Sequence, residues 1–198
     1  RAKRRNDILD VAIEVLSERG YRDMTMLEVA RRARASKETL YAWFGDKRGL
    51  FEALITRNAA VVQQVMADQL RQEAAPEEAL TAFGQALLTL LLGESAVALN
   101  RAAIAEAASD PVLAKTLAAA GRQATLPAFT RYLEDQSAQG HLAMTSSVDA
   151  AEDFLGLLLG DLQVRRLLGV QRAPNKAQIA ARAKAAAEKF LGLYGASA

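Results

Sequence analysis

Apolar residues recur at intervals of three and four along most of the chain, the spacing that places side chains on one face of a helix. The first such segment spans 7–19 and is followed by Gly20, a residue type that commonly ends helices. A later segment runs from Asp46 to Leu70. No segment alternates apolar and polar residues as a half-buried strand does, so the pattern predicts an all-α fold.

Five more helices are predicted beyond Pro76, which suits the first turn of a helix. Gly93 closes the first of them, and Ser146 and Asn175 are suitable N-caps for the last two. Pro127 lies inside the third, where a kink or break is expected because proline removes a backbone donor. The predicted ranges are 76–92, 95–108, 110–139, 146–168 and 175–194.

The most specific local pattern covers residues 25–50, which predict two short helices joined by a tight turn. Thr25 can cap the first helix, and Glu28 three residues later completes a capping box. The turn is expected at Arg34 and Ala35, after which Ser36 can cap the second helix. The apolar face of the first helix is expected to contain Leu27, Val29, Ala30 and Ala33.

The second of these helices, 37–44, has two unlike sides. Leu40, Trp43 and Phe44 share one side at spacings of three and four. The other side carries Lys37 and Tyr41, with Thr39 beside them. A helix that buries one face and offers a cation and two hydroxyls on the other has what a recognition helix in a DNA major groove needs. An ordinary helical hairpin with a solvated face is the alternative.

Gly45 ends this helix, and Asp46 can cap the next one. Lys47 then falls in a first helical turn, where the helix dipole disfavours a cation. Helix N-termini and lysines both attract phosphates, so a bound phosphate would remove the conflict. The sequence therefore predicts that Lys47 contacts the DNA backbone.

This stretch resembles the DNA-binding domain of the TetR family of bacterial transcriptional regulators. The resemblance rests on these positions: Thr25, Val29, Ala30, Ala33, Ser36, Lys37, Glu38, Thr39, Leu40, Tyr41, Phe44, Lys47 and Leu50. Family members usually have glycine where Arg34 stands, at a turn position that tends to need a positive φ, and often His or Tyr where Trp43 stands. The resemblance implies a DNA face made of Thr25, Ser36, Lys37, Thr39, Tyr41, Trp43 and Lys47, with residues 1–48 forming a helix-turn-helix domain.

The distribution of charge agrees with a DNA-binding N-terminal region. The chain has 25 Lys and Arg against 23 Asp and Glu, a net charge of +2. Residues 1–57 contain 13 basic and 9 acidic residues, a net of +4, so the remainder is net −2. A local excess of cations is the electrostatic footprint of a DNA-binding surface. The basic arm at 1–5 either reaches phosphates or a minor groove, or is simply solvated.

The composition leaves few residues that could act in catalysis or bind a metal. The chain has no cysteine and one histidine, His141, in an expected loop, so it offers no thiol nucleophile and no cluster of metal ligands. We therefore predict no catalytic residues, no metal site and no cofactor, and we do not expect an enzyme. Apolar runs are too short to span a membrane and no signal peptide is visible, which predicts a cytoplasmic protein without a membrane partner.

The predicted helix 146–168 is apolar on more than one face, as expected of a helix that is buried on nearly all sides. Gly156 and Gly160 would let another helix approach closely. We therefore predict a homodimer formed by the last two helices of each copy, a four-helix interface. The alternative is a core helix covered within one chain. The predicted interface residues are Phe154, Leu155, Leu158, Gly160, Leu162 and Phe190.

The C-terminal part resembles the AefR-like domain of some TetR regulators. The matching segments include Ala105-Glu106-Ala107 with Asp110-Pro111, and Phe154-Leu155-Gly156-Leu157. The resemblance implies a ligand-binding and dimerisation domain over 49–198, with a largely apolar cavity. The candidate lining residues are Phe83, Leu87, Leu91, Ile104, Glu106, Phe129 and Phe154, each of which is otherwise plain core or, for Glu106, a solvated or ion-paired residue.

These features together predict a ligand-responsive, dimeric repressor that binds a palindrome-like operator in double-stranded DNA. A small, largely apolar effector would release it by changing the spacing of the two DNA-reading heads. The unbroken helical pattern from Asp46 to Leu70 would carry that change. The alternatives are a helical binding module that acts on protein or RNA, and an enzyme, for which the chain lacks the usual catalytic groups.

Overall fold

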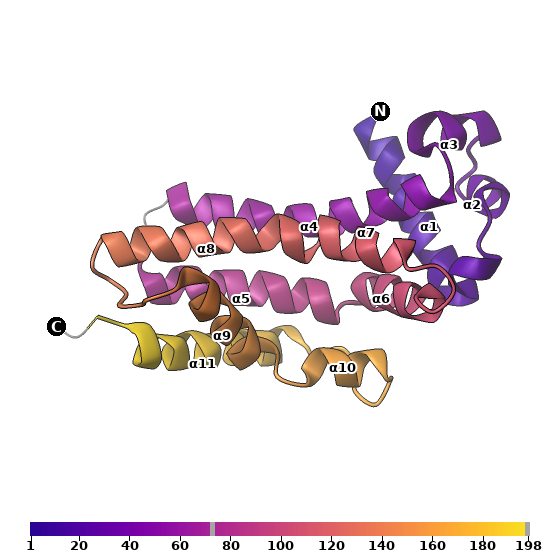
Figure 1. The fold of residues 1–198 in the computed structure, drawn as a ribbon. Coiled ribbons are helices and arrows are strands. Elements are labelled where there is room, and N and C mark those ends of the chain that lie inside the picture. The colour runs from indigo at the N-terminus through magenta and orange to yellow at the C-terminus, as the bar shows by residue number, and fades with distance from the viewer. Residues whose placement is uncertain (72–73, 197–198) are drawn as a thin grey trace. The chain divides into compact units, whose positions relative to one another are not determined.

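The computed structural model describes residues 1–71 and 74–196, and within them it confirms the all-α class. Eleven helices occur in these ranges, and the extended pairing among the described residues is a single bridge between Leu142 and Gly195. The helices, shown in Figure 1, are α1 (Ala2–Asp23), α2 (Met26–Arg32), α3 (Lys37–Phe44), α4 (Lys47–Arg71), α5 (Pro76–Leu92), α6 (Glu94–Glu106), α7 (Val112–Ala120), α8 (Arg122–Ala138), α9 (Ser147–Leu159), α10 (Leu162–Leu167) and α11 (Lys176–Tyr194).

The chain forms two compact units, each made of two segments. Unit 1 comprises Arg1–Asn58 and Glu94–Gly121, and unit 2 comprises Ala59–Gly93 and Arg122–Ala198. The N-terminal compact unit is therefore larger than the expected 1–48 domain, because α6 and α7 pack into it. Helix α4 is continuous through the described residues, as predicted, and its chain passes from unit 1 into unit 2 after Asn58.

The core of unit 1 joins apolar faces from α1, α2, α3 and the first half of α4 with α6 and α7. Ile8, Leu40 and Phe51 are fully buried in it, and Leu99 of α6 is buried among them. Gly20 adopts a φ of 73°, which interrupts α1 at the position where the sequence predicts its end. The helix begins at Ala2, however, so residues 2–5 form its first turn and not a free arm.

The core of unit 2 is dominated by aromatic rings from α5, α8, α9 and α11. The ring centroids of Phe83 and Phe129 are 4.3 Å apart, and Phe154 lies 5.3 Å from Phe129 and 5.5 Å from Phe190. Helices α5 and α11 run side by side in Figure 1, and α9 packs on both. This cluster of rings packs together four helices that are far apart in the sequence.

Two predicted helices are each broken in a place that the sequence reading missed. The predicted helix 110–139 ends at Gly121 and resumes at Arg122, and Pro127 lies within a continuous α8. The predicted helix 146–168 breaks at Gly160, which adopts a φ of 49° and separates α9 from α10. A glycine at such a position allows a backbone conformation that other residues adopt only with strain.

Candidate nucleic-acid interface

Helix α2 begins as the sequence predicts. The hydroxyl of Thr25 accepts a hydrogen bond from the backbone N–H of Glu28 at 3.2 Å. The reciprocal half of the capping box is replaced, because the carboxylate of Glu28 accepts hydrogen bonds from Arg31 and Arg32 instead. Leu27 does not belong to the apolar face as expected, since it is 64% exposed, and its neighbour Met26 is buried in its place.

The carboxylate of Glu28 is the centre of an ion network on α1 and α2. Hydrogen bonds from Arg31, and then from Arg32, lower its pKa from 4.5 to about 2. Arg32 also reaches Glu18 at 2.6 Å, and Arg19 lies 3.8 Å from Glu28. These pairs link α2 to α1 through side chains at the surface.

The turn after α2 has the strained geometry that the family resemblance implies. Arg34 adopts a φ of 49°, a left-handed conformation that is unfavourable for a residue with a Cβ. Arg4 of α1 holds this turn, because its guanidinium donates to the carbonyls of Ala33 at 2.8 Å and Arg34 at 2.7 Å. These carbonyls lie at the C-terminal end of α2, where they have no partner within the helix.

Two of the four basic residues in 1–5, Arg4 and Arg5, have partners within unit 1. Beside the bonds of Arg4, the guanidinium carbon of Arg5 lies 5.0 Å from the centre of the Phe44 ring, in cation–π geometry. Sequence reasoning offered DNA contact or solvation for this segment and missed this third role. The spacing of the residues contained no signal for it, because Arg4 lies 29 and 30 positions before its partners and Arg5 lies 39 positions before Phe44.

Helix α3 has the two sides that the sequence predicts. Ser36 caps it by accepting from the N–H of Thr39 at 3.1 Å. Leu40 and Phe44 are buried in the core of unit 1, and Trp43 is half-buried with its ring edge-on to Phe44. The indole therefore packs mainly against unit 1. Its remaining surface lines a hollow with Arg1 and Arg5.

The exposed side of α3 presents Lys37 and Tyr41 together. The ammonium of Lys37 lies 5.6 Å from the centre of the Tyr41 ring, and both residues are exposed. The hydroxyls of Ser36 and Thr39 are 3.0 Å apart at the start of the helix. Cation and hydroxyl groups are thus concentrated on the first two turns, where recognition helices contact DNA.

Lys47 has partners within unit 1 that the sequence reading did not anticipate. Its ammonium donates to the carbonyls of Tyr21 at 2.9 Å and Arg22 at 3.2 Å, and it lies 4.4 Å from the centre of the Tyr21 ring. These interactions stabilise a cation in the first turn of α4, where a phosphate was expected to do so. Asp46 caps α4 as predicted by accepting from the N–H of Gly49 at 2.8 Å.

The predicted pocket residues are divided between the two units. Ile104 and Glu106 belong to unit 1, where Ile104 is 61% exposed and Glu106 pairs with Arg22 at 3.6 Å. Phe83, Phe129 and Phe154 do meet in unit 2, but their rings pack directly on one another and fill the space between them. Leu87 is buried in the same core and Leu91 lies at its edge.

Three of the six predicted interface residues belong to the interior of unit 2. Phe154, Leu158 and Phe190 are completely buried within one chain, so they offer no surface to a second copy. Gly160 lies at the break between α9 and α10, and Leu155 and Leu162 are partly buried. The outer side of α9 is nevertheless open, because a Cβ added at Gly156 would meet no atom within 4 Å.

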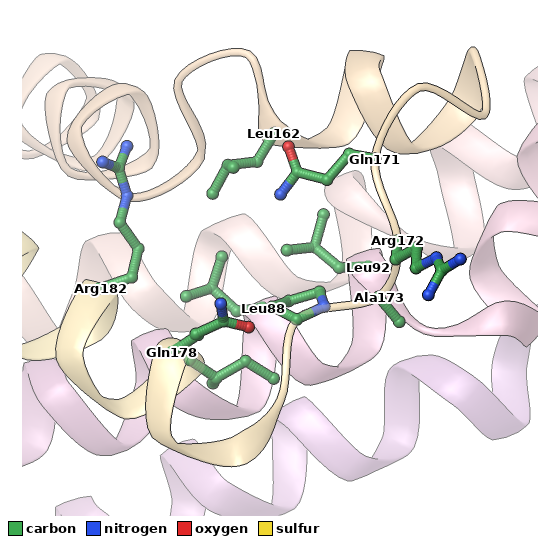
Figure 2. A pocket seen from close by; sticks show the side chains of 10 residues that line it. Leu88, Leu92, Leu162, Gln171, Arg172, Ala173, Gln178 and Arg182 are labelled. Carbon is green, nitrogen blue, oxygen red and sulfur yellow. The ribbon is translucent and has the colours of Figure 1, made fainter.

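A surface pocket of about 370 Å³ lies between the end of α5, α10 and the start of α11 (Figure 2). Leu88, Leu92, Leu162 and Ile179 supply its apolar lining, and Gln171, Arg172, Gln178 and Arg182 supply polar groups. None of these residues was among the predicted lining residues. Helical periodicity could not identify them, because the pocket depends on the break at Gly160 and on the loop before α11.

Two further observations concern metal ligands and apolar helices. Within residues 1–71 and 74–196 no group of three or more His, Asp or Glu side chains has the arrangement of a metal site. No single described helix is long and apolar enough to cross a membrane, and α5 and α6 reach that threshold only when they are counted together as a bent pair.

A capped short helix, a tight turn and a second helix with an exposed polar side define a helix-turn-helix protein of the DNA-binding class. The chain belongs to the TetR family of bacterial transcriptional regulators and carries an AefR-like C-terminal domain. The profile described as "Bacterial regulatory proteins, tetR family" matches residues 8–54, and "AefR-like transcriptional repressor, C-terminal domain" matches 78–196. Both resemblances stated from the sequence are confirmed.

Individual relatives agree with this assignment. A TetR transcriptional regulator from Agrobacterium tumefaciens is 35% identical, with a TM-score of 0.77 over 98% of this chain and 95% of that one. The flavonoid-responsive regulator FrrA is 27% identical, with a TM-score of 0.70 over the full length of both chains. YvkB of Bacillus subtilis, an uncharacterized HTH-type transcriptional regulator, is 40% identical over 53 residues, which are 27% of this chain and 28% of that protein.

Proposed function

We propose that this regulator is a dimeric repressor that binds a palindrome-like operator and is released by a small, largely apolar effector. The observation that carries the DNA-binding part is the exposed side of α3, where Lys37, Thr39 and Tyr41 face away from the core of unit 1. Arg4, Ser36 and Lys47 support that helix by satisfying backbone groups at the ends of α1, α2 and α3.

Each side chain on the DNA face has a distinct role. Lys37 contacts a phosphate, and Tyr41 and Thr39 donate hydroxyl hydrogen bonds to the backbone or to a base edge. Thr25 and Ser36 set the start of the two helices, and Trp43 packs behind the recognition side. Lys47 is a positioning residue, because two of its three N–H donors are directed to carbonyls of α1.

The second copy packs on the outer sides of α9 and α11. A Cβ added at Gly156 or at Gly192 would meet nothing within 4 Å, so each helix has an open position at which another helix can approach. Leu193, 66% exposed beside Gly192, adds apolar surface there. Two-fold pairing of these helices gives the symmetric dimer that a palindromic operator requires.

Coupling between effector and DNA follows the chain connections between the units. Helix α4 continues from unit 1 into unit 2, and α5 of unit 2 is joined through Gly93 to α6 of unit 1. A ligand that shifts α4 or α5 therefore acts on the unit that carries α3. The flavonoid response of FrrA, a relative along its full length, supports a small-molecule effector for this chain.

The test is operator binding by the purified protein, measured by fluorescence anisotropy with DNA from upstream of its own gene. We expect tight binding to a two-fold site, and loss of it when the half-sites are moved by half a helical turn. Lys37→Ala should lower affinity and reduce the slope of log K against log salt by about one per half-site.

Lys47→Ala is the matched control, since it removes an equal charge ten residues away. As a positioning residue it should lower affinity and the melting temperature while leaving the salt slope unchanged. If Lys47→Ala changes the slope and Lys37→Ala does not, the phosphate contact belongs to Lys47. If neither variant affects operator binding, α3 is not the DNA-reading element.

The dimer is tested by light scattering of Gly156→Arg at micromolar concentration. A large charged side chain at the open position of α9 should give a folded monomer with weak operator binding. A wild-type protein that is already a monomer, or a Gly156→Arg variant that remains a dimer, would contradict the proposed interface.

A further inference from the structure

The pocket at the end of α5 has a hydrophobic base. Leu88 and Leu92 of α5 are buried beneath it, and Leu162 of α10 and Ile179 of α11 flank them. A second hollow of about 450 Å³ shares Leu88, Leu92, Ala173, Pro174 and Ile179 with the first. Ala173 and Pro174 thus line both hollows, which share one apolar base.

The charged residues around these hollows all have the same sign. Arg172 and Arg182 line the first hollow and Lys176 lines the second, and the described lining of both contains no Asp or Glu. Cations beside an apolar surface favour amphiphiles that carry a negative charge, because a positively charged amphiphile would be repelled there. The lining therefore matches an anion attached to an apolar body.

Two side chains at the pocket have donors left over for such an anion. Arg182 uses its Nε to donate to the carbonyl of Leu158 at 2.8 Å, which leaves its terminal N–H groups without a hydrogen bond in the described residues. Gln178 accepts from the N–H of Asn175 through Oε1 at 2.9 Å, so its amide NH₂ remains a donor. Both side chains come from the first two turns of α11.

We propose that this pocket is a binding site for a small amphiphilic carboxylate, a molecule with one carboxylate and an aliphatic or aromatic body. The body lies on Leu88, Leu92, Leu162 and Ile179, and the carboxylate lies at the cationic rim, which has Arg182 on one side of the pocket and Arg172 on the other (Figure 2). Lys176 adds a positive charge at the adjoining hollow. A volume of about 370 Å³ lies within the range of about 300–1,000 Å³ that is usual for small-molecule sites.

The site contacts the part of unit 2 that leads into unit 1. Leu92 is the last residue of α5, and Gly93, which lines the second hollow, is followed in the chain by α6. Arg166 of α10 donates to the carbonyl of Leu92 at 3.0 Å and to that of Gln171 at 3.3 Å. A ligand seated on Leu92 and Gln171 therefore shifts residues that determine where α5 ends, and an effector role for it rests on the function proposed above.

Octanoate is a suitable probe, with octanol and octylamine as neutral and cationic analogues of the same length. By calorimetry at low ionic strength, octanoate should bind at least tenfold more tightly than either analogue, and it should raise the melting temperature. Octanol binding as tightly as octanoate would overturn the anion site. Octylamine binding more tightly than octanoate would reverse the assigned charge preference.

Three variants test whether octanoate binds in this pocket and not elsewhere on the protein. Arg172→Ala with Lys176→Ala, both exposed positions, should weaken octanoate about tenfold and leave octanol unchanged. Lys115→Ala with Arg131→Ala removes the same two charges elsewhere and should have no effect. Ile179→Trp should fill the pocket and abolish binding, with circular dichroism as the check of folding. If octanoate binds the wild type and all three variants with equal affinity, it binds elsewhere.

Operator binding gives the last readout. Octanoate should weaken operator binding by wild type and not by the Arg172→Ala, Lys176→Ala protein. If octanoate binds with the expected variant pattern while operator affinity stays constant, the effector role is overturned. If the apo protein fails to bind operator at all, the proposed repressor function fails, and octanoate binding still tests the pocket by itself.

Discussion

Unit 1 and unit 2 use cations in the same way and expose different surfaces. In unit 1, Arg4 and Lys47 donate to carbonyls at the C-terminal ends of α2 and α1. In unit 2, Arg166 donates to the last carbonyl of α5 and Arg182 to that of Leu158 near the end of α9. Helix C-termini leave such carbonyls without partners and carry partial negative charge, so a cation stabilises them in two ways.

The exposed side of α3 and the surface beside α10 and α11 differ, although unit 1 also exposes Leu27 and Ile104 elsewhere. The exposed side of α3 in unit 1 consists of a lysine, hydroxyl groups and a tyrosine ring. In unit 2, Leu168 is 71% exposed and Val170 is 69% exposed beside α10, and Leu193 is 66% exposed on α11. A polar, cationic surface suits DNA, and exposed apolar side chains are typical of surfaces that contact another protein or a ligand. The difference shows that basic residues near helix ends do not by themselves identify a DNA face.

The largest expected effect is on stability, and it compares truncation of a buried apolar residue of unit 2 with truncation of an exposed one. Phe154→Ala should lower the free energy of unfolding by about 3–5 kcal/mol, because its ring is fully buried against Phe129 and Phe190. Leu168→Ala, at an exposed position, should change it by less than about 0.5 kcal/mol. Urea denaturation of both variants provides the measurement, and similar losses would mean that the exposed apolar surface is covered in solution.

Arg4 tests the carbonyl contacts in unit 1. Arg4→Ala should destabilise the protein by about 1–2 kcal/mol, since it removes two charge-assisted hydrogen bonds at a partly exposed site. The salt slope of operator binding should remain that of wild type, because Arg4 contacts carbonyls and not phosphates. Lys3→Ala, a neighbouring exposed cation in the same helical turn, is the control. A slope reduced by about one would make Arg4 a phosphate contact.

Tyr132 provides the next contrast, because a polar group in unit 2 lacks a partner. Its hydroxyl is buried with no hydrogen bond to the described residues, and burial raises its pKa to about 12. Tyr132→Phe should therefore increase the free energy of unfolding, by about 1 kcal/mol, by removing an unsatisfied polar atom. A decrease on chemical denaturation would show that the hydroxyl has a partner that keeps unit 2 stable.

The smallest effect concerns the acid stability of unit 1. The pKa of Glu28, near 2 because of Arg31 and then Arg32, lies below its ordinary value of 4.5. A carboxylate with a depressed pKa contributes stability above the ordinary value, and this contribution is lost as pH falls from about 4.5 toward 2. Glu28→Gln should flatten that part of the stability profile, measured as melting temperature between pH 6 and 3. Equal acid sensitivity in both proteins would mean that Arg31 and Arg32 contribute nothing through Glu28.

Local signals account for most of what the sequence predicted about unit 1. The caps at Thr25, Ser36 and Asp46 each depend on a side chain and a backbone N–H three residues away. The strained turn at Arg34 also lies within a few residues of its neighbours. Interactions of this range are visible in the order of residues, so the helix-turn-helix was predicted with correct elements. Leu27 is the exception, because its direction depends on how α2 is packed.

Other features depend on contacts between distant segments, and the sequence did not reveal them. Whether Phe154 and Phe190 face a second copy or each other was decided by the packing of α9 on α11. The end of α9 falls at Gly160, and Arg182 of α11 donates to the carbonyl of Leu158 there. The pocket at Leu92 exists because that break brings α10 and the following loop over α5.

Periodicity and neighbours within one or two turns were enough to predict the helical class, the caps, the exposed polar side of α3 and the family resemblance. The partners of Arg4, Lys47 and Arg182 followed only from the packing of distant segments, since each partner is more than twenty residues away in the chain. It also decided which apolar residues are core and which are surface. A helical pattern shows that a side is apolar, and only the packing of the other helices determines what covers that side.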